Sequence, residues 1–118
     1  MRKKTAYTIG VEAEQKIAGH YISSGHQIIF ERYKTKYGEI DLIAKKDSQI
    51  VFIEVKARNN PMHLELLSQN QISRNCNAAL IFLAENEGFS NCDLRFDYAE
   101  IINGKISQVI ENAWVCEA

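Results

Sequence analysis

Two apolar segments separated by a short polar turn constrain the fold of this chain more than any other feature. Residues 38–44 (Gly-Glu-Ile-Asp-Leu-Ile-Ala) and 50–58 (Ile-Val-Phe-Ile-Glu-Val-Lys-Ala-Arg) are rich in β-branched residues, and the four residues 45–48 between them are polar or charged. This pattern predicts two antiparallel strands, at 39–44 and 49–56. The second segment begins with four apolar residues, as in a strand covered on both faces, and then runs into Glu54 and Lys56. Charged side chains in such a strand need partners.

The apolar pattern also predicts the register of the two strands. A turn centred between Asp47 and Ser48 matches apolar residues with apolar residues, whereas a slip by one position would bring polar and apolar side chains onto the same face. The predicted pairs are Ala44–Val51, Ile43–Phe52, Leu42–Ile53, Asp41–Glu54 and Ile40–Val55.

This register places the carboxylates of Asp41 and Glu54 opposite each other, with Cα atoms about 4.5 to 5.5 Å apart, where like charges repel. A hard divalent cation such as Mg²⁺ relieves such repulsion, because it takes carboxylate oxygens as ligands. Lys56 points to the same face as Glu54, and so do Glu39 and Arg58. Two carboxylates, a cation and a lysine suit the hydrolysis of a phosphodiester. The alternative is a cross-strand ladder of salt bridges on an open sheet face.

The remaining elements are predicted from periodicity and capping residues. Apolar residues at helical spacing indicate a helix from Thr8 to about Ser24, closed by Gly25, and Glu14 lies at the border of its buried stripe, where a third carboxylate can join a metal site. A second helix begins at a Ser68/Gln71 capping box and ends near Gly88. Its predicted buried stripe is Ile72, Cys76, Ala79, Leu80 and Leu83.

Three further strands complete the prediction. They lie at 27–33, 94–98 and 106–110, and Asn103-Gly104 signals a hairpin before the last of them. Asn59-Asn60-Pro61 ends the strand that carries Glu54. The order is α-β-β-β-α-β-β, which predicts an α/β fold with one mixed five-stranded sheet and both helices packed against it.

Composition excludes several classes of protein. The 118 residues are 46% hydrophobic and 25% charged, which is typical of one soluble domain, and no apolar run approaches the ~20 residues of a membrane span. We therefore expect a single cytoplasmic domain, 1–118. The three cysteines lack metal or disulfide-framework spacing and are expected to be reduced, and the three histidines lack metal-ligand spacing.

The net charge of −1 hides an asymmetry. Residues 1–58 hold eleven Lys and Arg against seven Asp and Glu, a net +4, whereas residues 59–118 hold three against eight, a net −5. A basic half is a weak indication of a surface that binds a polyanion. Tyr33 and Tyr37 interleave with Lys34 and Lys36, which is compatible with contacts to nucleic-acid bases, although packing is the simpler explanation for both rings.

The motifs together resemble a known family. One motif resembles the core of the restriction-endonuclease-like (PD-(D/E)xK) nucleases. It consists of Ile40-Asp41, twelve intervening residues and then Glu54-Val55-Lys56. A wider set of motifs is similar to the small bacterial YraN-like family: Glu14, residues 38–43, residues 51–58 and Arg95-Phe96-Asp97. That family is related to archaeal Holliday-junction resolvases and has no settled role. The similarity spans about residues 10–114.

The resemblance implies a restriction-endonuclease-like fold and a role for each matching residue. Asp41 and Glu54 would hold Mg²⁺ or Mn²⁺ together with the Val55 carbonyl, Lys56 would position or activate water, and Glu14 would complete the acidic cluster. Two positions depart from the family pattern. Ile40 replaces a proline, and Gln71 stands where many members carry lysine, with Arg74 one turn later as a substitute cation.

Two functions follow as expectations. The first is a metal-dependent DNA endonuclease that acts on branched or nicked DNA, as a homodimer if it cuts two strands. The second is a nucleic-acid-binding module on a nuclease fold with little or no turnover. The residues expected to contact the phosphate backbone are Lys34, Lys36, Lys45, Lys46, Arg58 and Arg74.

Overall fold

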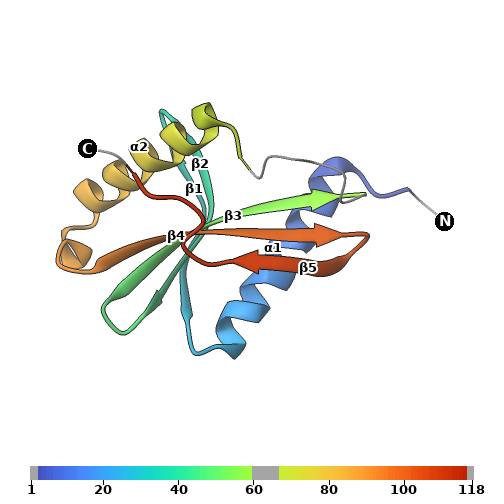
Figure 1. The fold of residues 1–118 in the computed structure, drawn as a ribbon, viewed down its shortest axis with the longest axis horizontal. Helices are drawn as coiled ribbons and strands as arrows, with labels where there is room; N and C mark the ends of the chain where they lie inside the picture. The colour runs from blue at the N-terminus through green and yellow to red at the C-terminus, as the bar shows by residue number, and fades with distance from the viewer. Residues whose placement is uncertain (1–2, 60–66, 117–118) are drawn as a thin grey trace.

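The computed structural model describes residues 3–59 and 67–116 and shows the predicted α/β architecture (Figure 1). Its elements are, in order, α1 (Ala6–Ser23), β1 (Gln27–Thr35), β2 (Gly38–Lys46), β3 (Gln49–Arg58), α2 (Gln69–Glu85), the 3-10 helix η1 (Glu87–Phe89), β4 (Asp93–Ile102) and β5 (Lys105–Ile110). The five strands form one sheet in the order β1-β2-β3-β4-β5. Neighbouring strands are antiparallel except β3 and β4, which are parallel because α2 connects them.

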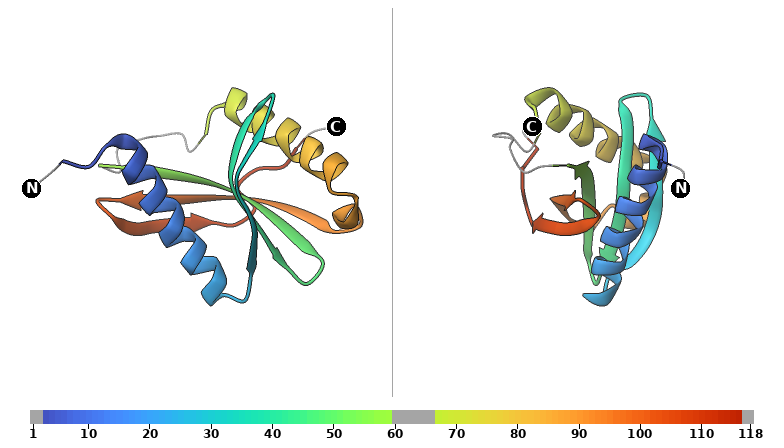
Figure 2. Two further views of the ribbon diagram at one scale, coloured as in Figure 1. Left: turned by 180° about the vertical axis from the view of Figure 1, so that it is seen from behind. Right: turned by 90° about the vertical axis from the view of Figure 1, so that its right-hand side faces the viewer.

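The helices cover opposite faces of the sheet (Figure 2), so the core has two layers. Under α1, Ala13, Ile17 and Tyr21 pack against β2, β3 and β4. Under α2, Phe82 contacts a group of aromatic rings at centroid distances of 5.1 to 5.8 Å: Phe30, Tyr33, Phe52 and Phe89. No helix in the described ranges is both long enough and apolar enough to cross a membrane.

Several predicted ends are confirmed, although β4 runs from Asp93 to Ile102 rather than over 94–98. Gly25 has φ +92° after α1, Asn103 and Gly104 have φ +50° and +80° in the last hairpin, and both halves of the Ser68/Gln71 capping box form. However, α2 ends at Glu85 rather than near Gly88, which lies in η1. The predicted strand end at 59–61 lies partly outside the described residues; β3 itself ends at Arg58.

Two predictions about side chains are wrong. Leu80 is 64% exposed, because the face of α2 that packs on the sheet is centred on Ala78, Ala79 and Phe82 rather than one position further around the helix.

The cysteines are not all reduced, although the sequence predicted that they would be. Cys76 and Cys116 form a disulfide, whereas Cys92 keeps a free thiol. Sequence spacing gave no sign of this bond, since 40 residues separate the two cysteines. Trp114 packs on Phe96, with ring centroids 5.6 Å apart, and so brings the C-terminal segment back to α2.

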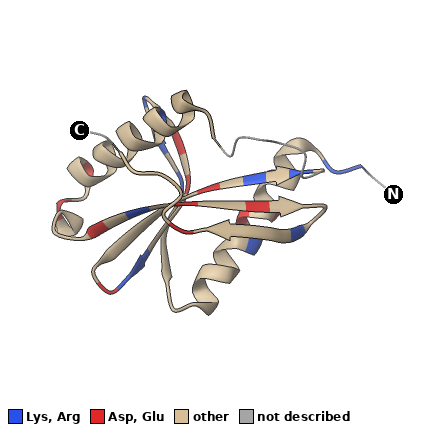
Figure 3. Cartoon of the chain, in the orientation of Figure 1, with Lys and Arg blue, Asp and Glu red and all other residues tan. Residues whose placement is uncertain are grey.

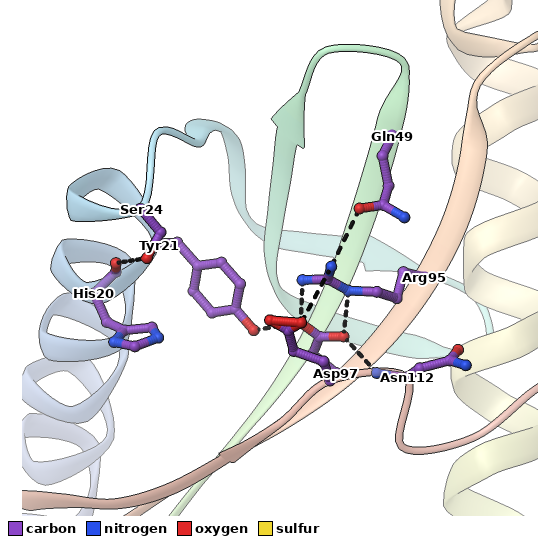
Figure 4. A network of polar contacts seen from close by, with 8 residues as sticks. His20, Tyr21, Ser24, Gln49, Arg95, Asp97 and Asn112 are labelled. Atoms are coloured by element: carbon purple, nitrogen blue, oxygen red, sulfur yellow. Dashed lines mark hydrogen bonds and ion pairs between the residues drawn. The ribbon is translucent and has the colours of Figure 1, made fainter.

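A buried ion pair ties α1 to the sheet (Figure 4). The Asp97 carboxylate is fully buried and accepts two hydrogen bonds from Arg95, at 2.9 and 2.8 Å, and one from the Tyr21 hydroxyl at 2.6 Å. The backbone N–H of Asn112 donates to the same carboxylate at 2.9 Å. Burial, together with the neighbouring Asp97 carboxylate, raises the pKa of Tyr21. Asp97 is therefore a fully satisfied buried charge.

We predict that this network contributes strongly to stability. Asp97→Asn removes the buried carboxylate that binds the Arg95 guanidinium and leaves only the exposed Glu111, at 3.5 Å, as its counter-charge, so it should lower the free energy of unfolding by about 3 kcal/mol. Tyr21→Phe removes one neutral donor and should cost about 1 to 2 kcal/mol. Urea denaturation measures both values. Equal costs for the two variants would show that the ion pair contributes no more than a single hydrogen bond.

Candidate active site

The predicted register of β2 and β3 is confirmed as far as the strands pair. Leu42–Ile53, Ile43–Phe52 and Ala44–Val51 are partners, and the turn is centred on Asp47 and Ser48. The ladder ends at Leu42–Ile53, so Asp41 and Glu54 are not a cross-strand pair. They instead lie at the point where β2 and β3 stop pairing.

The side-chain alternation of β1 and β2 changes at this point. Phe30 and Tyr33 are three residues apart, and both rings contact Phe82 on the α2 face. Ile40 and Ile43 also both belong to the α2 side of the core, although they too are three residues apart. A regular strand places residues two apart on one face. In both strands one extra residue therefore interrupts the alternation of side chains between the two faces. Arg32, between Phe30 and Tyr33, has φ +53°, which is unusual for a residue other than glycine.

The irregularity turns Asp41 toward β3. Its Oδ2 accepts a hydrogen bond from the backbone N–H of Val55 at 2.8 Å. The Asp41 carboxylate thus accepts the β3 N–H that a β2 carbonyl would accept if the two strands continued to pair. It lies beside Glu54. Proximity of the two carboxylates is as expected from the sequence, but the cause is this side-chain hydrogen bond rather than a strand pair.

Lys56 forms an ion pair with Glu54. Its Nζ lies 3.4 Å from Glu54 Oε1, and the Glu54 side chain is only 13% exposed. Acidic and basic residues follow one another along the second half of β3 (Figure 3). Further along the strand, Arg58 Nε lies 3.5 Å from an oxygen of the buried Glu100.

The two carboxylates are held in an environment that disfavours their charge. Burial and the neighbouring charge of Glu54 raise the pKa of Asp41 to about 8, although the Val55 N–H and Lys56 oppose the shift. Burial also raises the pKa of Glu54, against the opposing effect of Lys56 and of a hydrogen bond with the Asp41 carboxyl. A ladder of satisfied salt bridges would lower both pKa values. The raised pKa values therefore argue against the salt-bridge alternative.

Glu14 approaches the pair from α1. Its charge contributes to the raised pKa of both Asp41 and Glu54. Its Oε1 accepts a hydrogen bond from Arg32 Nε at 2.9 Å, and Arg32 Nη1 donates to the Tyr7 hydroxyl at 3.0 Å. No motif pointed to Arg32 in the sequence, because its role depends on the irregularity in β1.

A cavity of about 190 Å³ opens beside Glu54 on the α2 side of the sheet. Residues from the β1–β2 turn, from β3 and from the first turns of α2 line it: Tyr37, Gly38, Glu39, Glu54, Gln71, Arg74, Asn75 and Ala78. Arg74 thus shares a cavity with Glu54. The Gln71 side chain instead accepts the Ser68 N–H at 2.9 Å, as part of the capping box. The cation at this wall of the cavity is therefore Arg74.

Not all predicted basic residues lie near the carboxylates. Lys45 and Lys46 end β2, just before the β2–β3 turn, where their Nζ atoms donate to the carbonyls of Asp47 and Ser24 at 2.6 and 2.9 Å. They are four and five residues along β2 from Asp41, a distance of roughly 13 to 17 Å. Lys34 and Lys36 lie closer to the cavity: Lys34 is the strand partner of Glu39, and Lys36 adjoins Tyr37 in the β1–β2 turn.

The donor set fits a hard divalent cation. Asp41, Glu54 and the Val55 carbonyl supply oxygen ligands, and a cation between the two carboxylates would relieve their repulsion. In the part of the chain that the structure describes, no three His, Cys, Asp or Glu residues converge as a ready metal cluster. Any metal bound here would thus complete its shell with water or phosphate oxygens, as Mg²⁺ commonly does.

We predict that Asp41 and Glu54 destabilise the protein in the absence of a cation. Since both folded-state pKa values are raised, the folded chain binds more protons than the unfolded chain between about pH 4 and pH 8, and its stability falls as the pH rises through this range. Asp41→Asn and Glu54→Gln should therefore stabilise the metal-free protein at pH 8 by about 1 kcal/mol, or roughly 4 °C in Tm, with little effect at pH 5.

Thermal unfolding in the presence of a chelator measures this effect. Asp47→Asn, on the exposed turn of the same hairpin, is the matched control and should change Tm similarly at both pH values. Destabilisation by Asp41→Asn and Glu54→Gln at both pH values would instead favour the salt-bridge ladder.

Comparison with known proteins places this site within a family. Residues 13–101, which include all the site residues above except Tyr7, match the family described as "Uncharacterised protein family UPF0102". A UPF0102 protein of Mesorhizobium japonicum is 32% identical over 113 residues, covering 95% of this chain and 90% of that protein. A relative from Alkaliphilus metalliredigens is 38% identical, over 87% of this chain and 95% of that protein. A relative from a Sulfurihydrogenibium species is 36% identical, over 88% of this chain and 91% of that protein. The chain therefore belongs to UPF0102, the YraN-like family that its motifs resemble.

Proposed function

We propose that this protein is a Mg²⁺- or Mn²⁺-dependent endonuclease that hydrolyses phosphodiester bonds in branched or otherwise structured DNA. The observation that carries the proposal is the half-buried Asp41–Glu54 pair, with Val55 N–H 2.8 Å from Asp41 Oδ2, Lys56 Nζ 3.4 Å from Glu54 and raised pKa values for both acids. Buried acids with perturbed pKa values beside a lysine are typical of active sites. The resemblance of the same residues to the PD-(D/E)xK nucleases supports this interpretation.

Each residue of the site has a role in this reaction. Asp41, Glu54 and the Val55 carbonyl would hold the cation, which would supply Lewis-acid polarisation of the phosphate and a lowered pKa for a bound water. Lys56 holds the attacking water near Glu54. Glu14, fixed by Arg32, adds negative charge on the α1 side. Arg74 reaches the phosphate from the wall of the cavity.

The competing function is a DNA-binding module with little or no turnover. One observation favours it: Gln71 occupies the position of a family lysine, and its side chain is committed to capping α2. The chain then lacks one cation at the phosphate unless Arg74 replaces it. The two functions share a binding surface and differ in cleavage.

We predict cleavage of branched DNA in the presence of Mn²⁺. Asp41→Asn, Glu54→Gln and Lys56→Gln should each lower the cleavage rate by about 100-fold or more, because each removes a group that acts on the reacting phosphate. Lys45→Gln, on the distal turn, is the control and should cleave like the wild type. Gel analysis of a labelled four-way junction measures the rate.

Stability separates a catalytic effect from unfolding, since Asp41→Asn and Glu54→Gln are expected to be at least as stable as the wild type at pH 8. Equal cleavage by the wild type and by Asp41→Asn would contradict the proposed nuclease function. Tight, salt-dependent binding by a wild-type protein that cleaves no substrate would establish the binding module instead.

A separate prediction concerns which basic residues face the phosphate backbone. Arg74→Gln should weaken DNA binding and lower the slope of log K against log salt by about 1, because one phosphate contact is lost. Lys46→Gln should leave the slope unchanged, because Lys46 Nζ donates to the Ser24 carbonyl at the distal end of the hairpin. Fluorescence anisotropy at several salt concentrations measures both slopes. A larger loss for Lys46→Gln would place the DNA on the turn instead.

A further inference from the structure

Two exposed tyrosines each carry a cation against the ring. The guanidinium carbon of Arg32 lies 4.9 Å from the ring centroid of Tyr7, and Lys36 Nζ lies 5.3 Å from that of Tyr37. Tyr7 is 71% exposed and Tyr37 is 40% exposed. Both rings thus combine an accessible aromatic surface with a neighbouring positive charge.

Both tyrosines are connected to the carboxylates, by different contacts. Tyr37, in the β1–β2 turn, lines the same cavity as Glu54 and Arg74. Tyr7, in the first turn of α1, is joined through Arg32 to Glu14, whose charge acts on Asp41 and Glu54. Tyr7 thus approaches the site from α1, whereas Tyr37 lines a cavity that residues of α2 also line, on the opposite face of the sheet.

The other tyrosines near these elements have clear structural roles. Tyr21 is buried, and its hydroxyl donates to Asp97. Tyr33 packs on Phe30 and Phe82, and its hydroxyl donates to Glu85. Tyr7 and Tyr37 instead leave a large part of the ring to solvent, so packing in the core does not account for them.

The chemistry of the two pairs fits a nucleotide. An exposed ring stacks on a nucleic-acid base of any kind, and an adjacent arginine or lysine attracts the phosphate of the same strand. A base in a regular duplex has both faces covered by its neighbours and cannot stack on a side chain until it leaves the helix. Such a ring therefore selects unpaired bases over paired ones.

We infer that Tyr7 and Tyr37 are stacking platforms for unpaired bases on the two sides of the scissile phosphate. This inference rests on the proposed nuclease function and defines its substrate class: DNA whose strand is unpaired around the point of cleavage. Arg32 and Lys36 lie where they attract the adjoining phosphates. Double-stranded DNA without a branch or gap occupies neither ring.

The experiment compares two labelled DNAs of equal length: a fork with unpaired arms and a blunt duplex. Binding is measured by anisotropy with Ca²⁺ in place of Mn²⁺. Tyr7→Leu and Tyr37→Leu should each weaken binding of the fork by about 5- to 100-fold, the range expected for the loss of one base–aromatic stack. Binding of the blunt duplex should not change. Tyr7→Phe and Tyr37→Phe keep the ring and should bind the fork like the wild type.

Ile22→Ala is the matched control, because Ile22 is 58% exposed at the other end of α1. It should bind both DNAs like the wild type. A second measurement does not depend on any variant being folded: 2-aminopurine in the unpaired arm next to the branch should lose fluorescence when the wild-type protein stacks on it.

Unchanged fork binding by both leucine variants, equal losses for fork and duplex, or no quenching of 2-aminopurine would each overturn the inference. The proposed function is tested separately by cleavage with Mn²⁺. If the wild type and the tyrosine variants cleave the fork equally, the stacking role of Tyr7 and Tyr37 is wrong and the proposed nuclease function is supported. Tyrosine-dependent fork binding without cleavage keeps the platforms and rejects the nuclease.

Discussion

The hydrogen bond from the Val55 N–H to the Asp41 carboxylate is the contact on which the candidate site depends. It lies where the pairing of β2 and β3 ends, so it satisfies an edge N–H of β3 that a β2 carbonyl would otherwise bind. It also holds Asp41 beside Glu54 at a cost, because two neighbouring, half-buried carboxylates repel each other when both are ionised. A protein that keeps such an arrangement gives up stability, and functional sites are where this occurs.

Asp97, a fully buried acid in the same sheet, shows the contrast. Ile53 is the strand partner of Asp97, and Glu54 is the partner of Tyr98, so the two acids occupy neighbouring rows of the sheet. Asp97 is paired with Arg95 and accepts hydrogen bonds from Tyr21 and the Asn112 backbone, which is how a structural charge is satisfied. Asp41 and Glu54 have Lys56 and a single backbone N–H, and their pKa values rise. The more deeply buried acid is the one with more partners, so hydrogen bonds and ion pairs separate the structural acid from the half-buried candidate catalytic pair.

Much of the fold follows from local patterns. The polar turn at Asp47 and Ser48 and the apolar residues around it predicted the register of β2 and β3, and the Ser68 capping box and the Asn103-Gly104 hairpin formed as expected. Predictions that depend on a helix's rotation or on distant segments were less reliable. Leu80 faces solvent because α2 is rotated from the predicted orientation, and the Cys76–Cys116 disulfide depends on a C-terminal segment that returns along α2.

The sequence by itself determined the strands, their order and the residues Asp41, Glu54 and Lys56 as a group, because periodicity and spacing are local properties. The tertiary structure alone decided how that group is arranged. The change of alternation at Arg32 and Asp41 and the anchoring of Glu14 by Arg32 both depend on how α1 and α2 pack against the sheet. A strand pattern assumes regular alternation, and only packing from both faces shows where a strand departs from it.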